Sequence, residues 1–302
     1  MSNLSKISFR DKSSKIEEIC SWLSGHGIKI DRSRVKTYRT HINEIADYYE
    51  EGKVDELLKL RSFHELVNSC FEVNELIQIH EGLNDLKSQS FIERLVEVNK
   101  GPIWLNAENT SSSNRPRNIA FELHLAARFS KAGYEIDLSN DADLILKDHQ
   151  YEIFIECKRP HADHGIHSSV KDALSQLKKR YSSSKTSKTI RGLIALSISR
   201  VINPDMYLLH SNTTDDLNIK LQSINLTFID QYKTNWSKPD DKRTIGALIY
   251  LGLPAIINDQ NILTNCNQFD FYLNDYVSNM DKDVLKIMMS RIIEGRIAIR
   301  PY

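Results

Sequence analysis

Hydrophobic positions in the first hundred residues recur at spacings of three and four, which is typical of amphipathic helices. One such stripe runs from Ile16 to Leu23, and Gly25 marks its end. A second helix is predicted from Ser33, and further helical stripes follow up to about residue 100. No alternating strand pattern interrupts them. Residues 1–110 are therefore predicted to form an α-helical domain.

The pattern changes after a polar stretch, residues 99–118, which is rich in Pro, Gly, Ser and Asn and is typical of a linker or surface loop. From Arg117 to Ile198 the predicted order is one helix, three strands, one helix and one strand. Four further elements are predicted: a helix from Asp216, a buried strand from Ile245, a short strand from Phe269 and a helix from Val284. Residues 111–302 are therefore predicted to form an α/β (α+β) domain.

The stretch from Ala142 to Lys158 is written as two short apolar strands joined by a polar turn. Side chains on a strand alternate between its faces, so Glu156 and Lys158 point to the same side with Cα atoms roughly 6.5 Å apart. This spacing brings an acid and a cation within reach of one bound phosphate.

The register of this hairpin decides which acid joins them. If His149 and Gln150 form a two-residue turn, Asp143 lies directly opposite Glu156 and projects to the same side. A three-residue turn would send Asp143 to the other face. Asp141 has the same strand parity as Asp143 and is the rival ligand if the turn is longer. Asp137 and Asp148 are further competing acids.

Two carboxylates and a strand carbonyl, that of Cys157, form a hard oxygen site suited to Mg²⁺ or Mn²⁺. A metal there polarises a phosphate and acidifies a water molecule, while Lys158 orients that water and neutralises the charge that develops. The pattern therefore predicts a metal-dependent phosphodiesterase.

Asp143 and the element Glu156-Cys157-Lys158 resemble the first acid and the ExK element of the PD-(D/E)XK nuclease superfamily. The order of elements from Arg117 to Ile198 is similar to the restriction-endonuclease-like αβββαβ core, which has a central mixed sheet. The resemblance covers somewhat over a quarter of the chain. Ala142 stands where the family name has a proline. The resemblance implies a Mg²⁺-dependent deoxyribonuclease, an endonuclease in restriction or anti-phage defence.

Two helical residues are further candidates for this site. Glu122 lies on an apolar helix face, where a half-buried carboxylate needs a partner or a task. The resemblance implies that Glu122 joins the metal site, and a salt bridge to Arg115 or Arg117 is the alternative. Gln176 lies at the margin of the next apolar stripe. The resemblance implies that it assists the site, and a solvent-facing glutamine is the alternative.

Positive charge is concentrated directly after this stretch, in Lys171, Lys178, Lys179, Arg180, Lys185, Lys188 and Arg191. Lys plus Arg and Asp plus Glu each total 40, so the net charge is zero and any surface for nucleic acid must be local. The cluster predicts a track for phosphates, with a solvated helix face as the alternative. The basic residues Arg32, Arg34, Lys36 and Arg39 allow a helix-turn-helix or an ordinary α-hairpin.

Four cysteines without CxxC spacing, and a start without an apolar run after basic residues, predict a cytoplasmic protein with free thiols. No segment approaches the roughly 20 apolar residues of a membrane span, so no membrane contact is expected. The expected partner is DNA, with RNA as an open alternative. Double-strand cleavage from a single site would favour a homodimer. A non-cleaving nucleic-acid-binding or assembly module is the alternative function.

Overall fold

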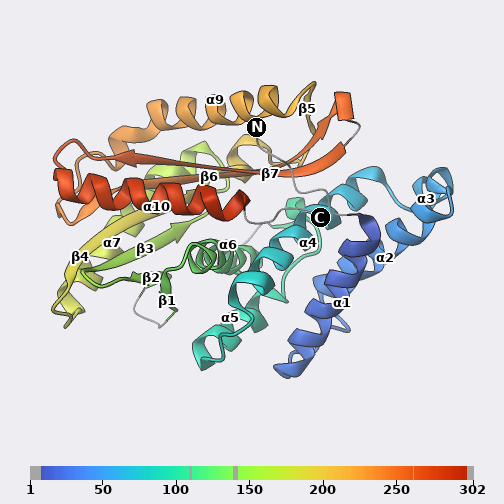
Figure 1. Ribbon diagram of the computed structural model, residues 1–302, viewed down its shortest axis with the longest axis horizontal. Coiled ribbons are helices and arrows are strands. Elements are labelled where there is room, and N and C mark those ends of the chain that lie inside the picture. The colour runs from blue at the N-terminus through green and yellow to red at the C-terminus, as the bar shows by residue number, and fades with distance from the viewer. Residues whose placement is uncertain (1–7, 109–110, 139–141, 261, 298–302) are drawn as a thin grey trace. The chain divides into compact units, whose positions relative to one another are not determined.

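The structure is a computed structural model that describes residues 8–108, 111–138, 142–260 and 262–297 (Figure 1). The chain forms two compact units, and the division falls inside a helix between Ala127 and Arg128. Described residues 8–127 and 205–208 form the helical unit, and described residues 128–204 and 209–297 form the sheet unit. The domain boundary predicted near residue 110 lies just before that helix and stays a prediction.

The helical unit confirms the predicted run of N-terminal helices. Its elements are α1 (Phe9–Gly25), α2 (Arg34–Glu50), α3 (Val54–Leu60), α4 (Phe63–Leu83), α5 (Gln89–Val98), the 3₁₀ turn η1 (Leu105–Ala107) and the first part of α6 (Ser111–Lys131). The stripe from Ile16 to Leu23 lies in the core, with both residues at most 3% exposed. Apolar periodicity therefore identified the buried face of α1.

Serine caps explain where several of these helices begin. Ser33, Ser62 and Ser88 each accept a hydrogen bond from the backbone N–H three residues along the chain. Ser62 and Glu65 also form a reciprocal capping box. A side-chain cap contributes about 1 kcal/mol, because it pairs a backbone donor that the helix leaves unbonded. The predicted start of a helix at Ser33 is confirmed.

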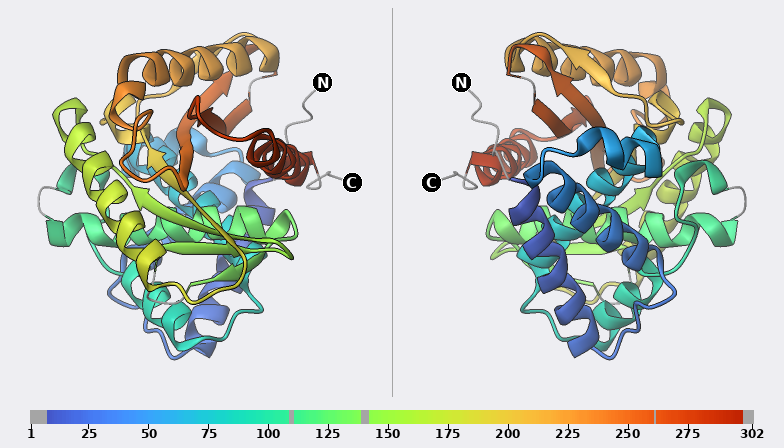
Figure 2. Two further views of the ribbon diagram at one scale, coloured as in Figure 1. Left: turned by 90° about the vertical axis from the view of Figure 1, so that its left-hand side faces the viewer. Right: turned by 90° about the vertical axis from the view of Figure 1, so that its right-hand side faces the viewer.

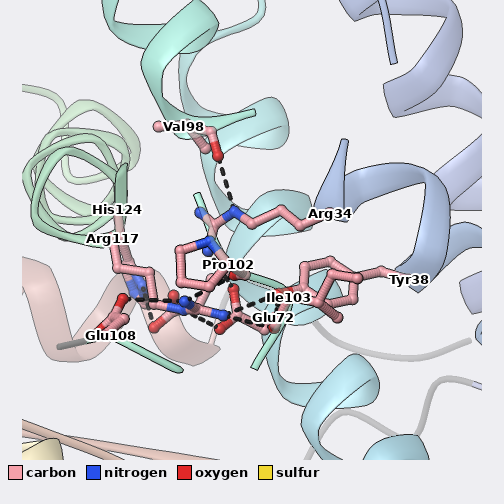
Figure 3. Close-up of polar contacts among 10 residues, drawn as sticks. Arg34, Tyr38, Glu72, Val98, Pro102, Ile103, Glu108, Arg117 and His124 are labelled. Carbon is pink, nitrogen blue, oxygen red and sulfur yellow. Dashed lines mark hydrogen bonds and ion pairs between the residues drawn. The ribbon is translucent and has the colours of Figure 1, made fainter. Parts of the chain in front are cut away.

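A network of buried charges joins α2, α4, α6 and the segment before α6 (Figure 3). Arg117 donates hydrogen bonds to Glu72 at 2.6 Å and to Glu108 at 3.0 Å. Arg34 donates to the other oxygen of Glu72 at 3.1 Å. All four side chains are buried. Two cations therefore balance two carboxylates inside the helical unit.

Backbone carbonyls complete this network. Arg117 donates to the carbonyls of Pro102 and Ile103, and Arg34 donates to that of Val98 at 2.9 Å (Figure 3). Arg34 was one of four basic residues that allowed a helix-turn-helix or an ordinary α-hairpin, but it is buried, so it is not available to contact DNA. The sequence marks Arg34 as a basic residue but gives no sign of Glu72, which lies on α4 and compensates its charge.

The sheet unit contains a mixed sheet, as predicted (Figure 1). Its strands are β1 (Glu135–Asp137), β2 (Leu144–Lys147), β3 (Tyr151–Lys158), β4 (Thr189–Ser197), β5 (Leu209–Ser211), β6 (Thr244–Ile257) and β7 (Ile262–Leu273). The order of hydrogen-bonded strands is β1-β2-β3-β4-β6-β5. β4 and β5 pair with different parts of one edge of β6, and β7 pairs with its other edge. Strands β1, β2 and β3 are antiparallel neighbours, whereas β3, β4 and β6 run parallel.

Strand β6 is the longest strand and organises the second half of this sheet. β4 pairs with its beginning, β5 pairs with its last three residues, and β7 runs antiparallel along its other edge. Its side chains are buried almost throughout, which matches the apolar run that predicted a buried strand from Ile245. The strand predicted from Phe269 is the second half of β7, which begins at Ile262.

Helices cover both faces of the sheet (Figure 2). The helices of this unit are α7 (Ile166–Ser183), α8 (Ser199–Ile202), α9 (Thr214–Tyr232) and α10 (Asn279–Ile297), with 3₁₀ turns η2 (Asp163–Gly165), η3 (Lys233–Asn235) and η4 (Asn258–Gln260). Tyr181 of α7 packs edge-on against Phe154 of β3. Asp281 of α10 pairs at 2.8 Å with Arg191, whose register partner Ile153 lies on the opposite face from Phe154. α7 and α10 therefore lie on opposite sides of β3 and β4.

A glycine in β4 fixes how closely α7 approaches the sheet. A Cβ atom added at Gly192 would lie 1.7 Å from the hydroxyl oxygen of Tyr181. That hydroxyl forms a hydrogen bond of 2.8 Å with Thr244 at the start of β6. Gly192 therefore leaves the space in which Tyr181 reaches across β4 and holds α7 against the sheet.

Gly192→Ala is expected to lower the free energy of unfolding by about 1 to 3 kcal/mol, because Tyr181 must move and give up its hydrogen bond. Urea unfolding followed by circular dichroism measures the change. Gly165→Ala is the matched control, since an added Cβ there meets no atom within 4 Å and its φ of −85° suits any residue. Equal stability of the two variants would contradict the close approach of Tyr181.

Candidate functional site

The hairpin of β2 and β3 has the predicted register. Leu144 pairs with Ile155, and Lys147 pairs with Glu152. One further step along the same ladder places Asp143 opposite Glu156. Directly opposed residues on antiparallel strands project to the same side, so both carboxylates face the side of the sheet that α7 covers. The predicted parity of the hairpin is confirmed.

Asp148 explains why the turn has two residues. Its Oδ1 accepts hydrogen bonds from the backbone N–H groups of Gln150 and Tyr151 at 2.8 and 2.9 Å. The N–H of Asp148 in turn donates to the carbonyl of Tyr151, so His149 and Gln150 form the turn as predicted. An aspartate often stabilises a turn in this way. This acid therefore has a local structural task away from the carboxylate pair.

Asp137 and Asp141 are the other two competing acids. Asp137 of β1 forms an ion pair of 2.6 Å with Lys147 of β2. Asp141 lies outside the described residues, so its claim as an alternative ligand stays a prediction.

Asp143, Glu156 and Lys158 lie together at the end of β3. The Oδ2 atom of Asp143 accepts a hydrogen bond of 2.7 Å from the backbone N–H of Cys157, which fixes this carboxylate against the strand. The Nζ atom of Lys158 lies 4.0 Å from Oε2 of Glu156. Glu156 is only 1% exposed. The site thus combines a deeply buried carboxylate, a second carboxylate and a lysine.

Burial raises the pKa of the Glu156 carboxyl, and the neighbouring charge of Asp143 raises it further, to about 8. Lys158 and Arg180 lower the pKa, but not enough to offset these effects. A carboxylate so disfavoured in its charged form is unusual in a stable fold, because the fold must supply the free energy that holds it there. This electrostatic conflict is typical of a functional site.

Helix α7 supplies two side chains to this site, one to Lys158 and one to Glu156. Gln176 accepts a hydrogen bond of 2.5 Å from Nζ of Lys158. Arg180, one helical turn later, donates from Nε to Oε1 of Glu156 at 3.4 Å. Residues four apart lie on one helix face, which explains why both reach the end of β3. The predicted proximity of Gln176 is supported, whereas Arg180, predicted to lie on the track for phosphates, lies against Glu156.

The remaining residues of the predicted phosphate track are mostly at the surface. Lys171, Lys179 and Lys185 are exposed, and Lys178 is exposed with its Nζ 4.0 Å from Asp240. Lys188 donates a hydrogen bond of 2.5 Å to the backbone carbonyl of Asp148, at the turn of the β2–β3 hairpin. Four lysines of α7 and the loop after it are therefore presented to solvent.

Two of the predicted site residues have contacts other than those expected. Glu122 belongs to the helical unit and forms an ion pair of 2.6 Å with Arg94, a partner that the sequence did not indicate. Arg191 pairs with Asp281 on the opposite face of the sheet from α7. Arg191 therefore does not belong to the surface formed by the α7 lysines, and the metal role of Glu122 stays a prediction.

A divalent cation fits the donor set of Asp143 and Glu156. Mg²⁺ is commonly held by one or two carboxylates and keeps several of its water molecules. Among the described residues no group of three or more His, Cys, Asp or Glu side chains is placed to hold an ion. The protein ligands would then be these two carboxylates and the backbone carbonyl of Cys157, whose role stays a prediction.

Comparisons of the chain with protein-family models, with curated proteins and with solved structures found no match. Within the part of the chain that the structure describes, none of the helices has a stretch long and apolar enough to cross a membrane. The functional interpretation therefore depends on the geometry of the site itself.

Proposed function

We propose that this chain is a Mg²⁺-dependent deoxyribonuclease of the PD-(D/E)XK superfamily, an endonuclease that acts in restriction or anti-phage defence. The observation that carries the proposal is the hairpin register, which puts Asp143 opposite Glu156 with Lys158 and Gln176 beside them. Four polar side chains from two strands and a helix converge at the end of β3. Packing alone gives no reason to bury a carboxylate next to another carboxylate.

The order of elements supports the same proposal. Helix α6, strands β1, β2 and β3, helix α7 and strand β4 follow one another along the chain. β3 and β4 lie side by side and parallel, so that α7 is a crossover between neighbouring strands. This order is similar to the αβββαβ order of a restriction-endonuclease-like core, and the acid and lysine lie at the end of the third strand. Fold likeness alone would not identify a function, and the site carries that step.

Asp143 and Glu156 would hold Mg²⁺ or Mn²⁺, which, when bound, polarises a phosphodiester and acidifies a water molecule. Asp143 is already oriented for this task by the N–H of Cys157. Glu156 is fixed by its position inside a buried strand. The two carboxylates would therefore lose little conformational freedom on binding, which favours affinity.

Lys158 lies where its positive charge would stabilise the transition state. Its ammonium group lies close enough to Glu156 to face the same phosphate, and Gln176 holds it by accepting one of its hydrogen bonds. An ammonium group has three N–H donors, so two stay available for a water molecule and a phosphate oxygen. Lys158 would thus orient the attacking water and neutralise charge that develops in the transition state.

The exposed lysines around α7 support a nucleic-acid substrate. Lys171, Lys178, Lys179 and Lys185 lie on the helix that contributes to the site, or in the loop after it. Contacts of this kind attract the phosphate backbone without reading its sequence. DNA is the substrate that we propose, and a homodimer would give two sites for cutting both strands.

Cleavage of plasmid DNA tests this proposal. The wild-type protein in Mg²⁺ is expected to nick or linearise plasmid, whereas Asp143→Ala and Lys158→Ala are expected to leave it supercoiled. Glu152→Gln is the matched control, because Glu152 lies on the same strand face as Glu156 but four residues from the site. This variant should cut like the wild type.

Labelled single- and double-stranded RNA in the same assay tests the alternative of an RNA-processing nuclease. Binding of DNA in a gel-shift assay without cleavage of any substrate would favour the second alternative, a non-cleaving binding or assembly module. If the wild type cuts neither DNA nor RNA faster than Asp143→Ala and Lys158→Ala, the nuclease proposal is refuted.

A further inference from the structure

Arg180 is the second cation, after Lys158, beside the carboxylate pair Asp143 and Glu156. Its Nε lies 3.4 Å from Oε1 of Glu156, while Nζ of Lys158 lies 4.0 Å from Oε2. Each oxygen of Glu156 therefore faces a different positive group. With Asp143 included and Glu156 ionised, the formal charges of these four side chains sum to zero without any bound ion. Arg180 thus balances a site that a divalent cation would otherwise have to neutralise.

The geometry of this contact distinguishes it from a permanent structural ion pair. Charge-assisted hydrogen bonds between nitrogen and carboxylate are typically about 2.7 to 2.9 Å long. Arg191 and Asp281, in the same unit, meet this standard at 2.8 Å, with side chains 22% and 6% exposed. Arg180 lies farther from its partner, and its side chain is 31% exposed. Its hold on Glu156 is therefore loose and open to solvent.

We propose that Arg180 is an exchangeable counter-ion. Its guanidinium pairs with Glu156 until a divalent cation binds, and the side chain then moves so that the guanidinium contacts the phosphate of the substrate. The inference rests on the proposed nuclease function and deepens it. A divalent cation at Asp143 and Glu156 makes the positive charge of Arg180 surplus and repels it. An incoming phosphate supplies the negative partner, and a guanidinium binds phosphate oxygens in a bidentate manner.

Lys158 is less suited to this exchange. Gln176 accepts a hydrogen bond of 2.5 Å from Lys158, and the lysine side chain is 19% exposed against 31% for Arg180. Arg180 also lies next to Lys179, which is exposed on the same helix. The guanidinium would therefore connect the carboxylate pair to the lysines that attract the phosphate backbone.

The proposal predicts opposite changes in two affinities of Arg180→Gln. Affinity for Mg²⁺ or Mn²⁺, measured by calorimetry on the full chain without nucleic acid, should rise on the order of three- to tenfold, because a repelling charge is gone. Affinity for a fluorescein-labelled DNA duplex in Ca²⁺, as a non-cleaving substitute, should fall about tenfold. Arg180→Lys should leave cation affinity within about twofold of the wild type, since the charge is kept.

Lys179→Gln is the matched control, because it removes the same charge from the neighbouring position. It should weaken DNA binding and leave cation affinity unchanged. If Arg180 merely braced Glu156, Arg180→Gln would bind the cation more weakly, and that result or an unchanged cation affinity overturns the proposal. If the wild type itself binds no divalent cation, both the proposed metal-dependent function and the proposed role of Arg180 are refuted. Cation binding by the wild type with unchanged affinity in Arg180→Gln overturns the role of Arg180 alone.

Discussion

Glu156→Gln is expected to abolish cleavage and at the same time to stabilise the protein in the absence of divalent cations. The loss of activity should be at least about 10²-fold, because a metal ligand and its charge are removed. The gain in stability should be on the order of 2 to 3 kcal/mol at pH 7. Glutamine has the shape of the glutamate side chain but carries no charge, so burial next to Asp143 no longer carries an electrostatic penalty.

The dependence of this gain on pH follows from the raised pKa. The folded protein keeps the proton of Glu156 up to about pH 8, whereas an unfolded chain releases it near the ordinary value of 4.5. Between these values the folded state binds more protons, so the free energy of unfolding of the wild type falls as the pH rises. The stability of Glu156→Gln has no such contribution. The difference between the two proteins should therefore grow from pH 5 to pH 8.

Urea unfolding in EDTA across this pH range measures the effect, and thermal unfolding with added Mg²⁺ provides the complement. Mg²⁺ should stabilise the wild type and not the variant, since a ligand that binds the folded state raises its stability. The matched control is Glu152→Gln, whose stability should stay within about 0.5 kcal/mol of the wild type at each pH. A less stable Glu156→Gln would indicate that Glu156 is a satisfied structural residue.

Local rules were enough to predict the hairpin that carries the site. A two-residue turn and strict alternation along the strands put Asp143 opposite Glu156, and both rules act over a few residues. The Asx-type hydrogen bonds of Asp148 reinforce the same turn. Periodicity likewise placed Gln176 at the edge of the buried stripe of α7. For these residues the local pattern and the fold agree.

The contact between Arg180 and Glu156 depends on information that no local pattern contains. It requires the distance and rotation of α7 over β3, and these are set partly by Tyr181, which reaches past Gly192 to Thr244. Tyr181 and Thr244 are 63 positions apart in the chain. A basic residue on a helix face is compatible with solvent or with a buried partner. From the sequence alone, Arg180 was predicted to lie on a track for phosphates, with a solvated helix face as the alternative.

The length of β7 was missed for a related reason. Its first half, from Ile262, mixes apolar and polar residues and is only partly buried, so it has no clear strand periodicity. Pairing with the last residues of β6 makes it a strand, with Ile257 opposite Ile262. Strand propensity depends strongly on such neighbours, which are chosen by the tertiary fold.

Arg117→Met is expected to lower the free energy of unfolding of the helical unit by about 3 to 5 kcal/mol. Methionine fills a similar volume but removes the guanidinium that pairs with Glu108, whose side chain is 0% exposed. Glu72 keeps one of its two arginines, Arg34. Removing one partner of a buried ion pair costs more than the pair contributes, because the remaining charge stays buried without that partner.

Hydrogen exchange on peptides of the helical unit, together with urea unfolding, measures this loss. Arg115→Met is the matched control, since Arg115 lies on the same helix with a side chain 68% exposed and its nearest carboxylate 3.7 Å away. Exposed pairs of this kind contribute roughly 0 to 1 kcal/mol. Equal effects of the two substitutions would contradict the network.

The double variant Arg117→Met with Glu108→Gln separates the two causes of this instability. If the loss of the arginine beside the buried charge of Glu108 dominates, removing that charge should recover about 1 to 2 kcal/mol of the loss, although Glu108→Gln alone destabilises the wild type. If the lost hydrogen bonds of Arg117 to the carbonyls of Pro102 and Ile103 dominate, the two losses should simply add. We expect recovery, because a buried carboxylate that loses its arginine is more costly than two carbonyls that lose a donor.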